Sequence, residues 1–148
     1  MPSTYTSLHF HLVFATKHRE PTIASAWRPW LHQYMGGVVR ESRGIALSVG
    51  GVEDHVHLLV GLSPTHCLSD FMRALKSASS ARAKAWCSFP GFQWQEGYSA
   101  FTVSDSGLTR VKRYIERQEE HHQRQSYRDE LTAYLRATGI EFDERCLD

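Results

Sequence analysis

The chain has 148 residues, of which 41% are hydrophobic, and its formal net charge is +1 with the histidines counted as neutral. This length supports one globular domain, residues 1–148, and no apolar run is long enough to span a membrane. The small net charge gives no support for a nucleic-acid protein, and three scattered cysteines without a CxxC pair argue against disulfides or a cysteine zinc site and for a reducing cytoplasm.

The first half of the chain predicts alternating strands and helices. Alternating residues predict a strand over 8–15, and a helix follows over about 24–43, before Gly44. Two more strands are predicted, over 45–52 and 56–62. A second helix then ends near Trp86, with Thr65 and Ser69 as candidate N-caps.

The second half adds one strand and two helices. After an aromatic-rich loop, a strand is predicted over 98–103, followed by helices over 107–122 and 127–137, the last ending at Gly139. The order of all elements predicts an α+β fold. We expect a ferredoxin-like (RRM-like) antiparallel sheet with helices packed on it, and extra C-terminal helices.

Two histidines mark the third strand. Because side chains alternate between the two faces of a strand, His55 and His57 point the same way. Two imidazoles side by side can hold a divalent metal and leave coordination positions open, as a catalytic metal requires. Such a tripeptide also occurs by chance, and His9-Phe10-His11 is a second copy, so histidines that are merely hydrogen-bonded are the alternative interpretation.

A tyrosine and a glutamine share one face of the helix expected over 107–122. Tyr114 and Gln118 are four residues apart and flank the apolar stripe of that helix. A tyrosine hydroxyl can act as a nucleophile, and a metal held by two histidines and a glutamine oxygen could polarise a phosphodiester for it. The alternative interpretation is that both residues only border the core.

Several segments, taken in this order, give the chain a resemblance to a known family. They are residues 11–19, 54–60, 76–80, 94–104, 114–122 and 139–145, which include Asp54-His55-Val56-His57-Leu58-Leu59-Val60 and Tyr114-Ile115-Glu116-Arg117-Gln118. Together they resemble the single-tyrosine HUH transposases of the insertion-sequence-200-like family, which move DNA as single strands.

The resemblance implies a role for each candidate residue. His55, His57 and Gln118 would bind a divalent metal, Mg²⁺ or Mn²⁺, and Tyr114 would attack single-stranded DNA. That attack gives a 5′-phosphotyrosine link and a free 3′-hydroxyl, which later reverses the reaction on another strand. The resemblance also implies recognition of hairpins near the element ends, and a homodimer in which the tyrosine helix of one subunit completes the histidine site of the other.

Basic residues predict a path for the DNA backbone. Arg73, Lys76 and Lys84 lie in a stretch without acidic residues and would form one helix face along the phosphates, with Lys17 and Arg19 as further candidates. Phe89, Phe92 and Trp94 offer stacking surfaces for unpaired bases, although core packing is the more ordinary interpretation of such aromatics.

The remaining histidines are given supporting roles. His9 and His11 are expected near the third-strand histidines, because the first and third strands of this fold are adjacent. His121 and His122 are expected to cap the carbonyls at the end of their helix.

Three other functions compete with this interpretation, and the first of them lacks its main group. A histidine-triad nucleotide hydrolase needs a histidine where this chain has Leu59. A non-catalytic module that holds single-stranded nucleic acid on the same fold needs neither Tyr114 nor Gln118 and predicts no metal dependence. A domesticated nuclease that serves the host would keep the cleavage chemistry, and the sequence does not separate it from a mobile-element enzyme.

Overall fold

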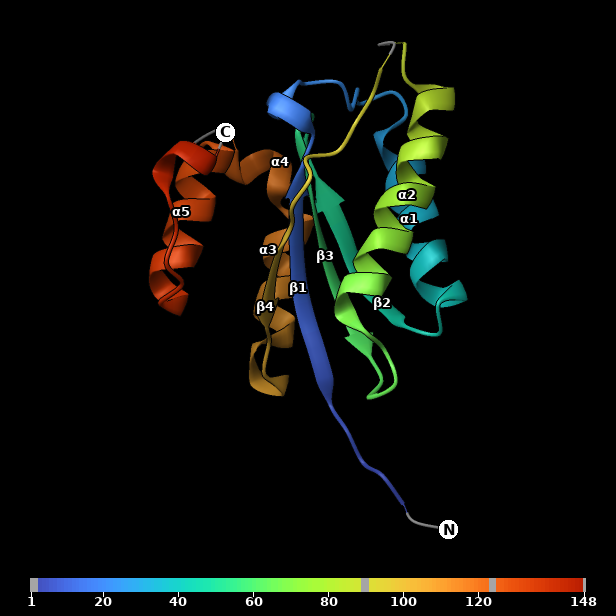
Figure 1. Cartoon of the computed structure of the whole chain (residues 1–148), viewed down its shortest axis with the longest axis vertical. Helices are drawn as coiled ribbons and strands as arrows, with labels where there is room; N and C mark the ends of the chain where they lie inside the picture. Colours follow the sequence, from blue (N-terminus) through green and yellow to red (C-terminus); the bar gives the residue numbers. More distant parts are fainter. Residues whose placement is uncertain (1–2, 89–90, 123–124, 148) are drawn as a thin grey trace.

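The computed structural model describes residues 3–88, 91–122 and 125–147, and a four-stranded antiparallel sheet lies at its centre (Figure 1). The strands are β1 (Leu8–Ala15), β2 (Ile45–Gly51), β3 (His55–Leu62) and β4 (Ser99–Thr102), in the spatial order β2-β3-β1-β4. This is the strand order of a ferredoxin-like sheet, so the predicted fold class is confirmed.

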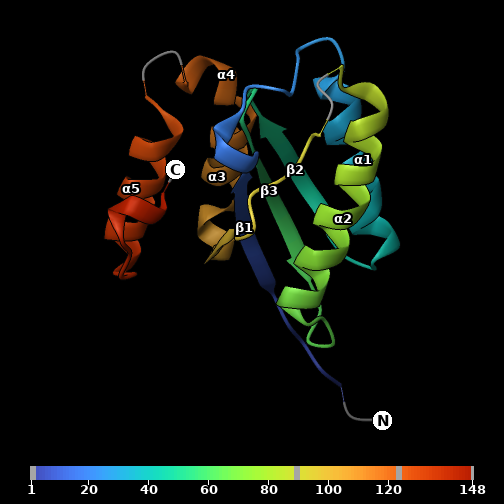
Figure 2. The ribbon, with the colours of Figure 1, turned by 45° about the horizontal axis from the view of Figure 1, so that its top comes forward.

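Helices cover both faces of the sheet (Figure 2). On one face lie α1 (Arg28–Glu41) and α2 (Leu68–Trp86); on the other lie α3 (Leu108–Glu116), α4 (Gln118–His121) and α5 (Tyr127–Thr138). Short 3-10 turns occur at Lys17–Arg19, Asp105–Gly107 and Glu144–Cys146. Within the described ranges, no helix combines the length and the hydrophobicity needed to cross a membrane.

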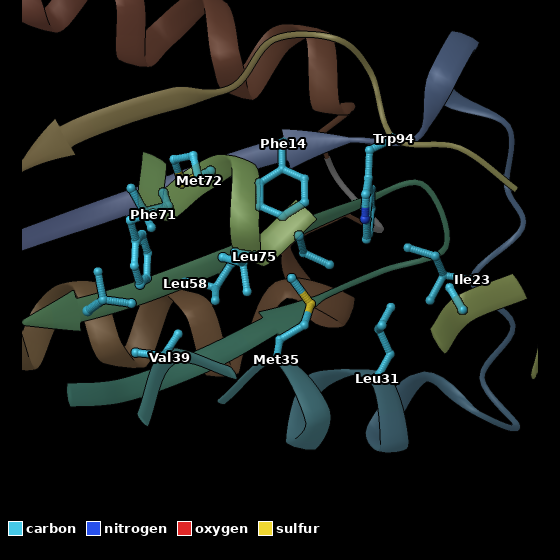
Figure 3. Close-up of a cluster of buried hydrophobic side chains, with 14 of the residues drawn as sticks. Phe14, Ile23, Leu31, Met35, Val39, Leu58, Phe71, Met72, Leu75 and Trp94 are labelled. Carbon is cyan, nitrogen blue, oxygen red and sulfur yellow. The ribbon is translucent and has the colours of Figure 1, made fainter. Parts of the chain in front are cut away.

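The larger hydrophobic core lies between the sheet and the helices α1 and α2 (Figure 3). Phe14 and Leu58 enter it from the two central strands, Leu75 meets them from α2, and all three are fully buried. Trp94 adjoins them, with its ring edge-on to Phe14 at 4.7 Å between centroids and its indole N–H donating to Ser79 Oγ at 3.0 Å. Burial of each large apolar side chain contributes about 1.5–3 kcal/mol, so this core accounts for much of the stability.

A smaller hydrophobic cluster attaches α5 to the other face of the sheet. Tyr127, Leu131 and Leu135 pack against Val13 of β1 and Phe101 of β4, and all five are buried. The second face is therefore apolar under α5 on the β1–β4 side, while α3 lies on the β2–β3 side. Polar side chains of the two central strands, β1 and β3, lie between α5 and α3.

The backbone of α3 approaches the sheet closely at Gly50. A Cβ placed on Gly50 would overlap the carbonyl oxygen of Ile115 and stand 3.0 Å from Ile115 Cγ2. Glycine at this position therefore allows the helix to rest directly on β2, and any side chain there has to push α3 outwards.

Two helix starts differ from those predicted. α1 begins at Arg28 rather than near residue 24, because the backbone of Trp27 is non-helical, with φ −121° and ψ −1°. α2 begins after Cys67 instead of Thr65 or Ser69, and no side chain caps its first turn. The expected end of the last long helix at Gly139 is confirmed, since α5 stops there with a φ of 70° that glycine readily adopts.

The helix predicted over 107–122 is interrupted at Arg117, whose φ of −105° and ψ of 22° separate α3 from α4. The side-chain amide of Gln118 donates to the Tyr114 carbonyl oxygen at 3.3 Å. In a continuous helix the backbone N–H of residue 118 would bind that oxygen, so the side chain takes over a backbone partner. The break turns Gln118 toward the sheet, where it is buried.

Candidate metal centre and nucleophile

The polar groups of the candidate site begin with a row of histidines on the face that carries α3, α4 and α5. His55 and His57 point to this face from β3, as the strand alternation predicts, and both are fully buried. His11 of β1 lies behind them, as predicted, with its Nε2 2.8 Å from His57 Nδ1, and burial lowers the pKa of His11 to about 3. His55 Nδ1 donates to Asp54 Oδ1 at 2.7 Å. Both strand imidazoles are thus held by one ring nitrogen and keep Nε2 for other partners.

A carboxylate from α5 occupies the centre of the site. Glu130 is only 3% exposed, and its Oε1 lies 2.9 Å from His57 Nε2 and 3.5 Å from His55 Nε2. Its Oε2 lies 3.1 Å from His122 Nε2 and accepts a hydrogen bond from the Tyr114 hydroxyl. One carboxylate therefore connects the strand histidines, the residue after α4 and the tyrosine of α3.

This donor set fits a divalent metal ion. His55, His57, His122 and Glu130 offer four donor atoms that all lie within 4.8 Å of one another. Ligands bonded to one ion at about 2.1 Å stand about 3–4 Å apart, so small side-chain shifts bring these donors to bonding distance. Gln118 adds an amide oxygen, with Oε1 3.3 Å from His55 Nε2. Imidazole donors suit first-row transition metals such as Zn²⁺ and Fe²⁺, and carboxylate or amide oxygens suit Mg²⁺ and Mn²⁺, so the donor set is compatible with several divalent ions.

The pKa values of the clustered side chains also fit a site for a positive ion. Burial would lower the pKa of His55, but hydrogen bonds to Asp54 and Glu130 outweigh it and raise this pKa to about 9. Burial lowers the pKa of His57 to about 4. Burial would raise the pKa of Glu130, but hydrogen bonds from His122, His55 and His57 hold it well below its usual range. The proton on His55 therefore balances the buried carboxylate, as a bound cation would.

Tyr114 stands at the edge of this cluster and is half-buried. Its ring lies edge-on to His57 at 5.7 Å between centroids, and its hydroxyl is 3.3 Å from His121 Nε2. Burial and the charge of Glu130 raise the pKa of the Tyr114 hydroxyl above its ordinary value. The tyrosine and both strand histidines belong to one chain, so they meet without a second subunit, and the homodimer with exchanged helices stays a prediction.

The sequence analysis missed three members of the cluster. His121 and His122 were predicted to cap the carbonyls at the end of their helix. Their side chains instead face Tyr114 and Glu130. A signal for His122 was present, because Tyr114, Gln118 and His122 follow one another at intervals of four residues. No comparable signal marks Glu130, since it lies on a different helix whose position depends on tertiary packing.

The residues predicted to contact DNA lie in two separate places. Lys17 and Arg19 follow β1 and lie at the end of the sheet that carries His55. Arg73, Lys76 and Lys84 lie on α2, across the sheet from the histidine cluster. Lys76 Nζ already donates to three backbone carbonyls of residues 95–97, at 2.6–3.1 Å. A role in DNA binding stays a prediction for all five.

Two of the three aromatics proposed to stack on bases, Phe92 and Trp94, belong to the protein core instead. Phe92 is 1% exposed and Trp94 is 7% exposed, and both pack in the larger hydrophobic core. Their rings are therefore not available to unpaired bases, because exposing them would disrupt that core. Phe89 lies outside the described residues.

Comparisons with known proteins agree with the fold and the histidine cluster. The family described as "Transposase IS200 like" matches residues 4–118. The chain is 28% identical over 120 residues to the ISDra2 transposase TnpA of Deinococcus radiodurans, covering 75% of this chain and 84% of that protein. The matched region of the family ends at Gln118, so His122 and Glu130 lie beyond it.

Two solved structures share the architecture. A crystal structure of a transposase from Deinococcus radiodurans R1 superposes with a TM-score of 0.64 and 28% identity, over 80% of this chain and 95% of that one. A REP-associated tyrosine transposase bound to a REP hairpin gives a TM-score of 0.60 at 14% identity, over 82% of this chain and 73% of that one, which supports the fold. With the family match extending over most of its length, the chain belongs to the IS200-like transposase family.

Proposed function

We propose that this chain cleaves and rejoins single-stranded DNA at hairpin-marked ends, through a transient 5′-phosphotyrosine link on Tyr114. The observation that carries the proposal is the shared carboxylate of Glu130, which binds the Tyr114 hydroxyl on one side and the imidazoles of His55 and His57 on the other. A nucleophile and a set of metal donors therefore face the same space, as metal-assisted phosphodiester cleavage requires. Family membership and the hairpin-bound relative support the choice of substrate.

In the proposed step a bond forms between the Tyr114 oxygen and phosphorus, and the bond from phosphorus to the 3′-oxygen breaks. His121 Nε2 accepts the tyrosine proton, because the surrounding histidines hold the pKa of Glu130 low and make its carboxylate a weak base. The 3′-oxygen leaves as a hydroxyl after it takes a proton from water. A divalent cation on the donors described above would stabilise the charge that builds on the phosphate. Attack of a 3′-hydroxyl on the phosphotyrosine reverses these steps and rejoins DNA.

The test uses a labelled single-stranded hairpin oligonucleotide from the flank of the gene, with Mn²⁺ or Mg²⁺, and a denaturing protein gel. We expect the label at protein mass for the wild type and for Tyr5→Phe, whose side chain is 91% exposed. Tyr114→Phe, His57→Ala and EDTA should each abolish the adduct. Hairpin binding without any adduct, unchanged in the variants, would instead support the non-catalytic binding module.

We further propose that each chain uses its own tyrosine. The contact of Tyr114 with the histidine cluster within one chain supports this arrangement. A mixture of Tyr114→Phe and His57→Ala proteins should then form no adduct, because neither chain has a complete site. Recovery of the adduct in the mixture would establish the exchange of tyrosine helices within a homodimer.

A further inference from the structure

We propose that Arg110 and Arg113 of α3, with Arg117 at the break that follows it, form a binding site for the backbone phosphates of the DNA strand that leads to Tyr114. The identity of this strand rests on the proposed function. Arg110 and Arg113 are three residues apart on α3, and Arg117 follows directly after the end of that helix. All three line the same cavity as Tyr114. We call these three residues the α3 arginine row.

The α3 arginine row lines a cavity that reaches the nucleophile. The cavity has a volume of about 570 Å³, and Tyr114 and His121 form part of its wall together with the three arginines. A strand lying in this cavity would pass its phosphates along the guanidinium groups on the way to the tyrosine hydroxyl. Guanidinium groups bind phosphate oxygens in a bidentate manner, so the row would also orient the backbone.

The charge of the row is not neutralised by the protein. All three arginines are exposed, and within the described ranges no acidic side chain forms an ion pair with them. Elsewhere on the surface, Arg136 and Arg145 do pair with Glu144 and Asp143. Glu120 contributes one negative charge to the cavity wall, so positive charge still dominates there. Like charges held close together repel each other, and a polyanion relieves that repulsion.

Two polyanionic occupants are conceivable, and the structure favours DNA. An acidic segment of a second copy, such as residues 141–144, has suitable charge. It would not explain why the cavity reaches Tyr114, whose proposed chemistry requires a phosphate beside its hydroxyl. A strand of DNA satisfies both the charge and the position, and the second copy becomes an outcome of the test.

The probe is a fluorescein-labelled oligothymidylate of 20 nucleotides, because phosphate contacts are independent of sequence and this strand forms no hairpin. Binding is measured without metal in a Tyr114→Phe background, so that cleavage does not interfere. One variant replaces the three row arginines with Ala, and a second replaces them with Lys. The matched control replaces three exposed arginines elsewhere, Arg40, Arg136 and Arg145, with Ala, so that the change in net charge is the same.

The expected result is a change in salt dependence. Each phosphate contact with a single strand contributes about 0.7 to the slope of log affinity against log salt, so three contacts contribute about 2. From 50 to 200 mM NaCl, binding by the unsubstituted row should weaken about 20-fold more than binding by the row-to-Ala variant. The row-to-Lys variant and the matched control should keep the full slope. Equal slopes for the row-to-Ala variant and the control would overturn the proposal. If the row-to-Ala variant kept the full slope but lost self-association in sedimentation, the occupant would be a second copy of the chain, and the proposal would also be overturned.

A second readout separates this proposal from the proposed function. Hairpin adduct formation is measured in chains that keep Tyr114, with and without the row-to-Ala substitutions. A reduced salt slope together with no adduct in the wild type would leave the phosphate site standing and refute the cleavage chemistry. Equal adduct formation by both proteins, at the same half-saturating DNA concentration, would overturn the phosphate site and leave the cleavage chemistry standing.

Discussion

Substitution of Gly50 by alanine should damage both stability and cleavage, although Gly50 has no side chain and is itself neither a metal donor nor the nucleophile; it pairs with His57 across the β2–β3 ladder. The added methyl group would overlap the Ile115 carbonyl oxygen and crowd Ile115 Cγ2 at 3.0 Å. A backbone atom of a packed helix cannot rotate away as a side-chain tip can, so α3 has to move outwards as a unit, by about 1 Å.

The expected magnitudes follow from this displacement. Overpacking of this kind costs about 1–3 kcal/mol, and in a chain of this length each kcal/mol lowers the melting temperature by about 2–4 °C, so Gly50→Ala should melt about 2–12 °C lower. Tyr114 precedes Ile115 and moves with it, away from His57. A misplacement of about 1 Å in a reacting group costs about 100-fold in rate, so adduct formation should fall by that factor.

The assay compares thermal melting and the rate of hairpin adduct formation in Gly50→Ala and Gly37→Ala. Gly37 is the matched control, because it lies inside α1 and a Cβ there would meet only the flexible tip of Arg40, at 3.8 Å. Alanine in a helix interior is favoured over glycine by about 0.5–1 kcal/mol, so this control should be slightly more stable and fully active. If Gly50→Ala melted within 1 °C of the wild type, with a wild-type rate as well, the argument about helix contact would be refuted.

Three further perturbations test other parts of the structure. Glu130→Gln should weaken Mn²⁺ binding at least about tenfold in calorimetric titrations, and Asp129→Asn, an exposed change on the same helix, should not; equal affinities would remove Glu130 from the donor set. Trp94→Phe should lower the free energy of unfolding by about 2 kcal/mol, because a core hydrogen bond and ring contacts are lost. The control Trp30→Phe changes a side chain that is 55% exposed and should alter this free energy by less than about 0.5 kcal/mol. Similar losses for the two variants in urea unfolding would contradict this. His32 has a folded pKa of about 4, lowered by burial and by the neighbouring Arg28, against 6.5 when unfolded, so it destabilises the fold progressively as pH falls from 6.5 through 4 and has no such effect above 6.5. His32→Leu should therefore retain about 3 kcal/mol that the wild type loses over that interval, and parallel acid-unfolding curves would exclude this role.

The local parts of the fold were predictable because they follow from backbone geometry. The period of two in a strand places His55 and His57 on one face and Leu58 on the other, and the structure has them so. The spacing of four residues, close to one helical turn of 3.6, brings Tyr114 and Gln118 to the same region in spite of the break between them. In both cases the pattern depends only on neighbouring residues, which is why a single sequence reveals it.

The parts that depend on tertiary packing were not predictable in the same way. Glu130 reaches the histidines only because the apolar side of α5 docks on β1 and β4, and its own neighbours in sequence are those of an ordinary helix start. At the break at Arg117, the side chain of Gln118 donates to the Tyr114 carbonyl oxygen, a bond that the spacing of residues does not reveal. Trp94 belongs to the core because its ring packs against Phe14 and its N–H donates to Ser79, and both partners are distant in sequence.

The unequal attachment of the helices has a consequence for access to the imidazoles. α1 and α2 enclose the larger core, whereas six buried residues of the described ranges form the cluster that holds α5, and Glu130 is carried by this less strongly held helix. Segments with fewer buried contacts open at lower free energy than the rest of a protein. Local opening of α5 would withdraw the carboxylate and uncover His55 and His57 while the other half of the molecule stays folded. The helix that completes the donor set is thus also the element whose detachment would expose the imidazoles.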